Sequence, residues 1–442
     1  MSAADTIFAL ASGRGRAGVA VIRVSGPAAV SVAVTLAGSC PPPRRAALRQ
    51  LRQGPDNGLL DEGIIIYFQR PGSFTGEDVV EFHVHGGPAV VSAVLTAIGK
   101  VPGARLAEAG EFTRRAFDNG RLDLTAVEGL ADLIAAETEA QRRQALRQAR
   151  GELAAVYDGW RQRLVSALAY VEAGIDFSDE ELPEDVAARA RPEVDSLRLE
   201  IMQALSDERR GERLRDGFEI AILGEPNSGK SSLLNALAKR DVAIVSARAG
   251  TTRDALEVHL DLDGLPITLV DTAGLRDSGD EVESEGIRRA HARAEEADLR
   301  LVLIPADVWP ALPAAVRPYA EGPGALLVVS KSDLLTVTPT GGVPAISVRT
   351  GQGLEALVAT LCQRAESCLS GGEMAVITRQ RHRQALMEAV DYLEAFLAAR
   401  TKEIELQAED LRLAARALGR VTGRVEVEDV LGAIFAEFCI GK

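Results

Sequence analysis

The spacing of apolar and polar positions changes along the chain. Residues 5–24, residues 63–69 and Val79–His85 alternate with a period of two, which is typical of strands, and glycine-rich turns separate them. After the turn Asp118-Asn119-Gly120, apolar residues recur every three or four positions, which indicates amphipathic helices. The pattern therefore predicts an N-terminal α+β domain followed by helices.

Several long helices are expected in the next segment. Thr125 and Glu128 have the spacing of a capping box, and Leu153–Val171 carries a second apolar stripe. An acidic stretch, Asp176–Asp185, precedes a third helix that is expected from Pro192 to Arg215. Because a helix cannot bury its own apolar stripe, these helices should form an antiparallel bundle.

Strands and helices alternate between residues 216 and 372, which predicts a mainly parallel sheet. The helical period then returns over residues 386–397, and a last helix is expected over Val427–Phe438. The prediction is a multidomain α/β protein in which one domain interrupts a helical domain. The expected domains are an α+β domain (1–118), a discontinuous helical bundle (119–215 and 373–442) and the inserted α/β domain (216–372).

The inserted domain begins with a phosphate-loop motif. Gly224–Ser231 fits G-x-x-x-x-G-K-S/T and lies between an apolar strand and a helix, the context in which backbone N–H groups surround phosphate oxygens. Lys230 should reach the β and γ phosphates of a nucleotide, and Ser231 should hold Mg²⁺. The expected contacts in this loop are Gly224, Asn227, Ser228, Gly229, Lys230, Ser231 and Ser232.

Three further motifs indicate that the nucleotide is GTP. Asp271-Thr272-Ala273-Gly274 ends an apolar strand, and it should place a carboxylate near Mg²⁺ and a glycine N–H near the γ phosphate. Ser330-Lys331-Ser332-Asp333 is a variant of N-K-x-D, in which Asp333 can accept two hydrogen bonds that only guanine donates. The amides of Ser347, Val348 and Arg349 should cap the base. The order of these motifs predicts a GTPase.

Ser330 stands where the N-K-x-D pattern has asparagine. Its side chain is shorter, so we expect it to tie the base loop less firmly to the phosphate loop. This expectation concerns nucleotide affinity and leaves the specificity for guanine unchanged.

Composition limits the remaining function classes. No apolar run reaches about 18 residues and the first residues lack a basic signal, so we expect no membrane span and a cytoplasmic location. Four irregularly spaced cysteines argue against a disulfide frame or a zinc cluster. The net charge of −14 opposes a broad nucleic-acid surface, and the arginines of 142–150 and 209–215 are expected on solvated helix faces. His83 and His85 share a strand face with Glu81, but the sequence suggests no third metal ligand.

Four further features lie outside the nucleotide motifs. They are Asp5–Ile7 with Gly18, Val19 and Arg23, then Phe74–Asp78 and His85–Pro88, then Gly110–Phe112 and Leu122–Leu124, and finally Cys439–Lys442. With these features, the chain resembles the MnmE (TrmE) family of tRNA-modification GTPases, a branch of the TrmE-Era-EngA-like GTPases, from Asp5 to Lys442. The resemblance implies a folate-binding-like N-terminal domain that dimerises and a Ras-like GTPase domain inserted in the helical domain.

The family resemblance also implies how GTP is hydrolysed. K⁺ would lie beside the phosphates at a dimer of GTPase domains, held by Asn227, Ser246, Arg248 and Thr251. Thr252 would complete the Mg²⁺ shell, and Glu283 would orient the attacking water. From the residues alone, Asn227 is as readily a loop-shaping residue, and Glu283 a solvated charge.

The resemblance further implies a site for a tetrahydrofolate one-carbon donor, with contacts from Arg23, Glu81, Arg121 and Lys442. Family members commonly have lysine where Arg121 stands, so the charge is kept while the hydrogen-bond geometry differs. Cys439 is either a small packed thiol or a nucleophile or redox partner in the modification chemistry.

The resulting hypothesis is a K⁺-stimulated GTPase that works with an FAD-binding, MnmG (GidA)-like partner. It would add an aminomethyl or carboxymethylaminomethyl group to carbon 5 of the wobble uridine of certain tRNAs, with nitrogen from glycine or ammonium. One alternative is a GTP-switched RNA-binding factor in ribosome assembly, which the acidic charge disfavours. Another is a folate-dependent methyltransferase regulated by GTP.

Overall fold

A computed structural model describes most of the chain, and its contacts divide the chain into two compact units. The described residues are 5–53, 58–176, 186–207, 209–239, 257–271, 292–322, 324–335, 339, 342–370, 375–398, 404–425, 434, 438 and 441. The first unit comprises Met1–Ala131, Arg147–Gln162 and Ala415–Lys442, and the second comprises Asp132–Leu146 and Arg163–Ala414. The division passes through helices α4 (Leu124–Ala135), α5 (Glu139–Ala149), α6 (Glu152–Asp176) and α13 (Ile404–Thr422).

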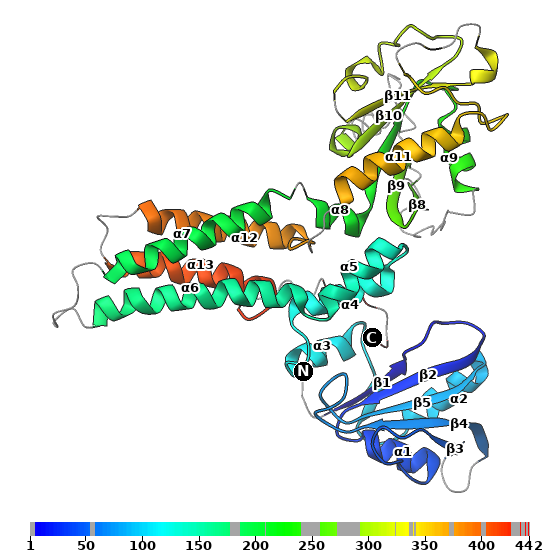
Figure 1. Ribbon diagram of the computed structural model, residues 1–442. Coiled ribbons are helices and arrows are strands. Elements are labelled where there is room, and N and C mark those ends of the chain that lie inside the picture. Colours follow the sequence, from blue (N-terminus) through cyan, green and yellow to red (C-terminus); the bar gives the residue numbers. More distant parts are fainter. Residues whose placement is uncertain are drawn as a thin grey trace, which may run out of the picture. The chain divides into compact units, whose positions relative to one another are not determined.

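A six-stranded sheet forms the core of the first unit (Figure 1). Its order is β3-β4-β5-β2-β1-β6, and all neighbours are antiparallel except the parallel pair β1 and β6. The strand, turn and strand predicted over residues 5–24 are confirmed. The strands are β1 (Thr6–Leu10), β2 (Ala17–Ser25), β3 (Ala47–Arg52), β4 (Leu59–Phe68), β5 (Val79–Gly86) and β6 (Ala104–Leu106).

Helices α1 (Ala29–Ala37) and α2 (Pro88–Ile98) cover one face of this sheet, where Ile22 and Phe82 are fully buried. On the opposite face, Phe112 of α3 (Glu111–Asp118) packs against β1. Side chains alternate between the faces of a strand, so Arg23 and Glu81 lie on the α3 side. Charged residues of two paired strands are thus brought onto one face.

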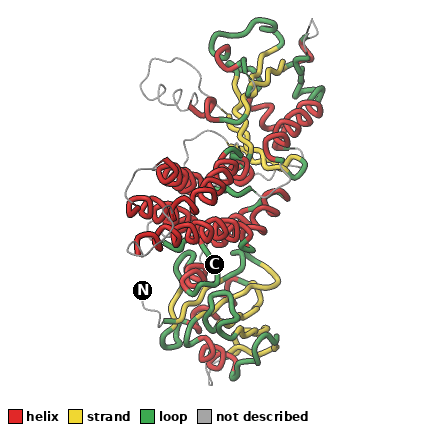
Figure 2. The backbone as a smooth tube through the Cα atoms, turned by 60° about the vertical axis from the view of Figure 1, so that its left-hand side comes forward, coloured by secondary structure: helices red, strands yellow, loops and turns green. Residues whose placement is uncertain are grey.

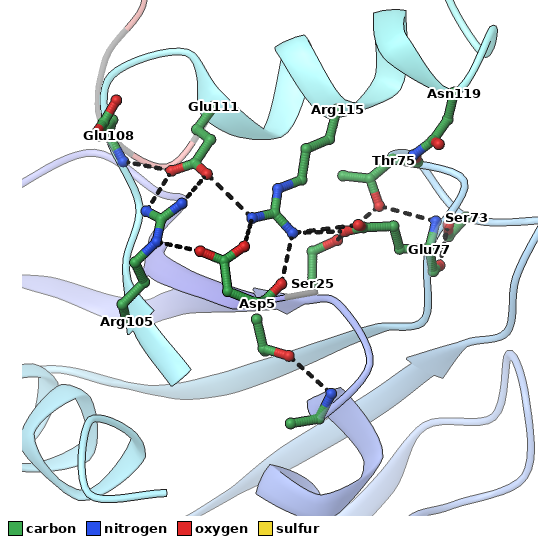
Figure 3. Close-up of polar contacts among 12 residues, drawn as sticks. Asp5, Ser25, Ser73, Thr75, Glu77, Arg105, Glu108, Glu111, Arg115 and Asn119 are labelled. Atoms are coloured by element: carbon green, nitrogen blue, oxygen red, sulfur yellow. Dashed lines mark hydrogen bonds and ion pairs between the residues drawn. The ribbon is translucent and has the colours of Figure 1, made fainter. Parts of the chain in front are cut away.

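A network of charged side chains joins β1 and β6 to α3 and to the loop before β5 (Figure 3). Arg105 donates to Asp5 (2.6 Å) and Glu111 (2.9 Å), and Arg115 donates to Asp5 (2.7 Å), Glu111 (3.1 Å) and Glu77 (3.2 Å). Burial alone would raise the pKa of Glu111, but hydrogen bonds, above all from Arg105, hold that pKa below its usual value. The carboxylate therefore stays charged although it is only 2% exposed.

The helical part of the second unit combines segments that are far apart in sequence. Parts of α6 and α13 lie side by side with α7 (Val186–Leu205) and α12 (Gln380–Ala398), as Figure 1 and Figure 2 show. Arg191 of α7 stacks on Phe396 of α12, with its guanidinium carbon 5.3 Å from the ring centroid. The predicted discontinuous helical bundle is confirmed. No helix among the described residues has the length and apolar character of a membrane span.

Two predictions about helix ends are wrong. The helix expected over Pro192–Arg215 is two helices, α7 and α8 (Arg210–Asp216), because a turn with Arg209 in the left-handed region (φ 63°) separates them. Asp123, not a capping box, begins α4: its carboxylate accepts the N–H groups of Thr125 (2.8 Å) and Ala126 (3.1 Å). The helix predicted over Val427–Phe438 lies outside the described residues, apart from Ile434 and Phe438.

The sheet of the second unit has the order β11-β10-β7-β9-β8, and all pairs are parallel except β8 with β9. Helices α9 (Lys230–Ala238) and α11 (Leu354–Leu369) pack on one face through a leucine-rich core. The predicted, mainly parallel sheet is confirmed. Its strands are β7 (Phe218–Leu223), β8 (Glu257–Leu262), β9 (Leu265–Asp271), β10 (Leu299–Pro305) and β11 (Ala325–Ser330).

We predict that Arg115→Met weakens the network of the first unit. The change removes the ion pair of Glu77 and leaves Asp5 and Glu111 paired with Arg105, which should cost about 3 kcal/mol of local stability. Hydrogen exchange of β1 and α3 peptides in the full chain measures this loss. Arg114→Met on the same helix is the control, because Arg114 makes an exposed pair at 4.0 Å and its loss should change stability by less than about 0.5 kcal/mol.

The same network should depend on pH. The folded chain lowers the pKa values of Asp5 and Glu111, so their contribution is present above about pH 4 and is lost as pH falls through the lowered values. Protection of β1 should therefore fall more steeply on acidification in the wild type than in Arg115→Met. Parallel pH profiles would contradict the assigned role of Arg115.

Candidate nucleotide site and N-terminal polar site

The phosphate loop connects β7 to α9 through backbone conformations that curl the chain. Asn227 (φ 63°) and Gly229 (φ 99°) both have positive φ, which turns successive N–H groups toward one side. Gly224 has no room for a side chain, since a Cβ atom there would lie 2.4 Å from Ser228 Oγ and 2.9 Å from the Leu303 carbonyl oxygen. The glycine of the motif is thus required by close packing against β10.

Lys230, Ser231 and Asp271 gather at this loop. Lys230 Nζ donates to the carbonyl oxygens of Gly224 (2.8 Å) and Glu225 (3.1 Å), and burial lowers the pKa of Lys230. Ser231 Oγ donates to Asp271 Oδ2 (3.2 Å). Asp271 Oδ1 is buried and has no hydrogen-bond partner among the described residues. A hydroxyl beside an unsatisfied carboxylate oxygen is a donor set that fits Mg²⁺.

The base loop follows β11 and is held to the phosphate loop. Ser330 Oγ donates to the Ser228 carbonyl oxygen at 2.6 Å, and both residues are buried. Ser330 therefore joins the base loop directly to the phosphate loop. Asp333 accepts Ser347 Oγ (2.6 Å) and the Arg349 guanidinium (2.7 Å), and these contacts, led by the Ser347 bond, hold the pKa of Asp333 below its usual value. Asp333 is thus a charged acceptor.

The amides expected to cap the base are not equivalent. The N–H of Ser347 donates to the Gln352 carbonyl oxygen (3.0 Å), so this amide is already satisfied. Its side chain acts instead on Asp333. For the N–H groups of Val348 and Arg349, the described part of the chain offers no partner. The expectation for Ser347 is corrected accordingly.

A second polar site lies on the α3 side of the N-terminal sheet. Arg23 donates to Glu81 Oε1 through Nε (3.0 Å), and its guanidinium carbon lies 5.2 Å from the Phe74 ring centroid and 5.8 Å from that of Phe112. His83 Nε2 is 3.4 Å from Glu81 Oε2. The structure thus joins two of the predicted folate contacts in one cluster.

The sequence motifs did not reveal the two rings of this cluster. Phe74 and Phe112 lie in stretches that carry the family resemblance, but rings stacked on a guanidinium follow no sequence period. Their presence restrains Arg23, because a cation between two aromatic faces is attracted by both. Arg121 packs near the same loop: a Cβ atom on Gly76 would lie 3.3 Å from Arg121 Cγ.

The end of the chain reaches the same unit. Gly441 (φ 105°) is so close to β1 that a Cβ atom there would lie 2.0 Å from the Leu10 carbonyl oxygen. Leu10 is paired with Ile22, the neighbour of Arg23. Predicted site residues outside the described part of the chain are Ser246, Arg248, Thr251, Thr252, Thr272, Ala273, Gly274, Glu283, Cys439 and Lys442.

The histidines, cysteines and arginines considered above as possible ligand or RNA contacts include several that have partners within the protein. His85 Nδ1 pairs with Asp61 (2.7 Å), and among the described residues no group of three or more His, Cys, Asp or Glu side chains could hold a metal ion. Cys362 is buried in the core beneath the second sheet, and the partly buried Cys368 packs against the same core. Arg213 and Arg215 are not on a solvated face as expected, because they pair with Asp298 (2.6 Å) and Asp132 (3.2 Å) and are only 25% and 28% exposed.

Comparison with known proteins identifies the family. A family described as "GTP-binding protein TrmE N-terminus" matches residues 6–121, and one described as "MnmE helical domain" matches residues 124–439. The "tRNA modification GTPase MnmE" of Parvibaculum lavamentivorans is 55% identical over 99% of this chain and 100% of its own. The chain belongs to the MnmE family. It is a GTP-binding enzyme that hydrolyses GTP in tRNA modification.

Other MnmE relatives give the same picture. The protein of Caulobacter vibrioides is 52% identical over 99% of this chain and 100% of its own. Among solved structures, Aquifex aeolicus Era is 24% identical and covers 42% of this chain and 69% of its own, with a TM-score of 0.27. The G domain of the T. maritima FeoB iron transporter is 25% identical over 33% of this chain and 98% of its own, with a TM-score of 0.26. Neither score adds to the MnmE assignment.

We predict that Asp333→Asn changes the base preference of this MnmE chain. An amide cannot accept both donors of guanine, so GDP affinity should fall by at least about 100-fold, while XDP, which carries a carbonyl in place of the amine, should bind better. Titration calorimetry of the full chain with both nucleotides measures this switch. Asp307→Asn, at an exposed turn after β10, is the matched control. Equal losses for GDP and XDP would show that Asp333 does not read the base.

Proposed function

We propose that the chain is a K⁺-stimulated, Mg²⁺-dependent GTPase that modifies the wobble uridine of certain tRNAs together with an FAD-binding, MnmG (GidA)-like partner. A tetrahydrofolate carries the one-carbon unit, and the product is an aminomethyl or carboxymethylaminomethyl group on carbon 5. The chain acts as a homodimer in the cytoplasm. The observation that carries this proposal is the Arg23–Glu81 pair, which lies in the same unit as the chain end.

The chemistry of that pair suits a pterin. Glu81 is a carboxylate acceptor for the amidine edge of a pterin ring, and Arg23 and Arg121 are cations for carbonyl or carboxylate groups. Arg23 and Glu81 are only 21% and 16% exposed, so their charges are partly shielded from water. Gly441 packs on Leu10 near this cluster, which supports contacts from Lys442 to the ligand and a role for Cys439 in the chemistry.

The nucleotide site supports hydrolysis without an arginine finger. Asn227 adopts positive φ within the phosphate loop, where its side-chain oxygen is a ligand suited to K⁺. A cation there offsets the charge that develops on the leaving oxygen. Ser246, Arg248 and Thr251 complete the K⁺ contacts, Thr252 joins Ser231 on Mg²⁺, and Glu283 orients the attacking water.

The partner is expected to share the tRNA contact. The net charge is −14, and the described arginines near α8 are engaged by carboxylates, so the chain offers little free positive surface in this region. The same observation weighs against a ribosome-assembly factor that binds RNA through a basic domain.

We predict that Glu81→Gln strongly lowers the amount of tRNA product and spares GTP turnover. Cells that lack the gene should regain a nitrogen-bearing group on carbon 5 of the wobble uridine with the wild-type chain, and at least about tenfold less with Glu81→Gln, because the amide no longer offers two acceptor oxygens. Mass spectrometry of tRNA nucleosides measures the product formed with each of the two chains. Glu62→Gln, at an exposed position of β4, is the control. If deletion of the gene leaves the nucleoside profile unchanged, the proposal fails. If the modified uridine carries a methyl group without nitrogen, the folate-dependent methyltransferase is the better account.

We predict that GTP turnover is at least about tenfold faster in K⁺ than in Na⁺, because the larger ion fits the oxygen ligands beside the phosphates. Asn227→Ala should remove this difference, and Asn235→Ala, exposed on α9, should keep it. Steady-state phosphate release at fixed ionic strength measures both. Equal wild-type turnover in the two salts would refute the cation role.

A further inference from the structure

The base subsite offers different groups to the two edges of guanine. Guanine presents N1–H and its exocyclic amine on one edge, and the acceptors O6 and N7 on another. The charged Asp333 suits the first edge. The amides of Val348 and Arg349 suit O6. A contact to N7 needs a further donor on the same edge as O6.

Ser330 is the last residue of β11 and begins the base loop. It is tied to Ser228 of the phosphate loop, it lies three residues before Asp333, and Val329 pairs with Ala345 just before the loop of Val348. In a bound guanine nucleotide, the phosphates lie in the phosphate loop, and the edge with N1–H and the exocyclic amine faces Asp333. The N7 side of the base then faces Ser330.

The hydroxyl of Ser330 has a single proton, and this proton is already used. Ser330 Oγ donates to the Ser228 carbonyl oxygen at 2.6 Å, where Ser330 is 5% and Ser228 0% exposed. Turning the hydroxyl toward a base would leave that buried carbonyl without its donor, which is costly. The asparagine of N-K-x-D has two N–H groups, so it can hold the loop and still donate to the base.

We propose that this chain reads guanine through Asp333 and O6 and makes no hydrogen bond to N7. Ser330 keeps the hydrogen bond to the phosphate loop, and it lacks the hydrogen bond to the base that the asparagine of N-K-x-D can make. The site consequently accepts a guanine nucleotide that has carbon in place of N7. This inference rests on GTP binding alone and is independent of the proposed tRNA chemistry.

The test compares the affinities of GDP, 7-deaza-GDP and IDP for the full chain with Mg²⁺, by titration calorimetry. We expect 7-deaza-GDP to bind within about twofold of GDP, since no hydrogen bond is lost. IDP lacks the amine that Asp333 accepts and should bind at least about tenfold more weakly. A loss of about fivefold or more for 7-deaza-GDP overturns the proposal, and so does equal binding of IDP and GDP.

Two variants test the role of position 330 directly. Ser330→Asn supplies a second donor, so it should bind 7-deaza-GDP about fivefold more weakly than GDP. Ser330→Ala removes only the tie and should weaken both nucleotides by the same factor. If Ser330→Asn folds but gains no preference for GDP, position 330 does not face N7 and the proposal fails. If it does not fold, the wild-type ratio of GDP to 7-deaza-GDP still decides.

Discussion

The parallel pairing of β7 with β9 and β10, and of β10 with β11, brings the carboxyl ends of these strands to one edge of the sheet. Groups that are distant in sequence meet there: Ser231 contacts Asp271 across 40 residues, and Ser330 contacts Ser228 across 102. The apolar side chains of these strands pack into cores on both faces of the sheet, and this packing holds the strand ends in place. The nucleotide site therefore depends on the packing of leucines that never approach a ligand.

The opposite end of the same sheet contacts the helical segment. The N–H of Ala140 in α5 donates to the Gly264 carbonyl oxygen (3.1 Å) in the turn before β9, and β9 ends seven residues later at Asp271. Asp132 accepts Arg215 of α8 (3.2 Å) and Arg379 before α12 (2.8 Å). Thus β9 ends at the candidate Mg²⁺ ligand Asp271, and the turn that precedes this strand contacts helix α5. Coupling of GTP hydrolysis to a change elsewhere in the chain would require a connection of this kind.

Local signals in the sequence predicted those features that depend on neighbouring residues. The phosphate loop, the parallel sheet and the amphipathic helices follow from spacing alone. The break between α7 and α8 was missed because apolar spacing resumes after the turn, and the start of α4 was misplaced because Asp123 competes successfully with Thr125 as a cap. The Asp5–Arg105–Arg115 network was not predicted, since its partners are about a hundred residues apart and no period links them. For the same reason, the sequence could not tell which atom the hydroxyl of Ser330 meets.

The two candidate sites differ in the groups that form them. The phosphate loop offers backbone N–H groups, so its sequence signature lies in glycines and conformation, and it can be recognised from a short motif. The N-terminal site is built from side chains of separate elements, which only the sheet register and the loops bring together. Even there the backbone limits which residues fit. A Cβ atom added to Gly76 (φ 80°) would lie 3.1 Å from Asn119 Cβ and 3.3 Å from Arg121 Cγ. A larger residue at this position would push Arg121 away, so the position of Arg121 depends on a glycine 45 residues earlier in the chain.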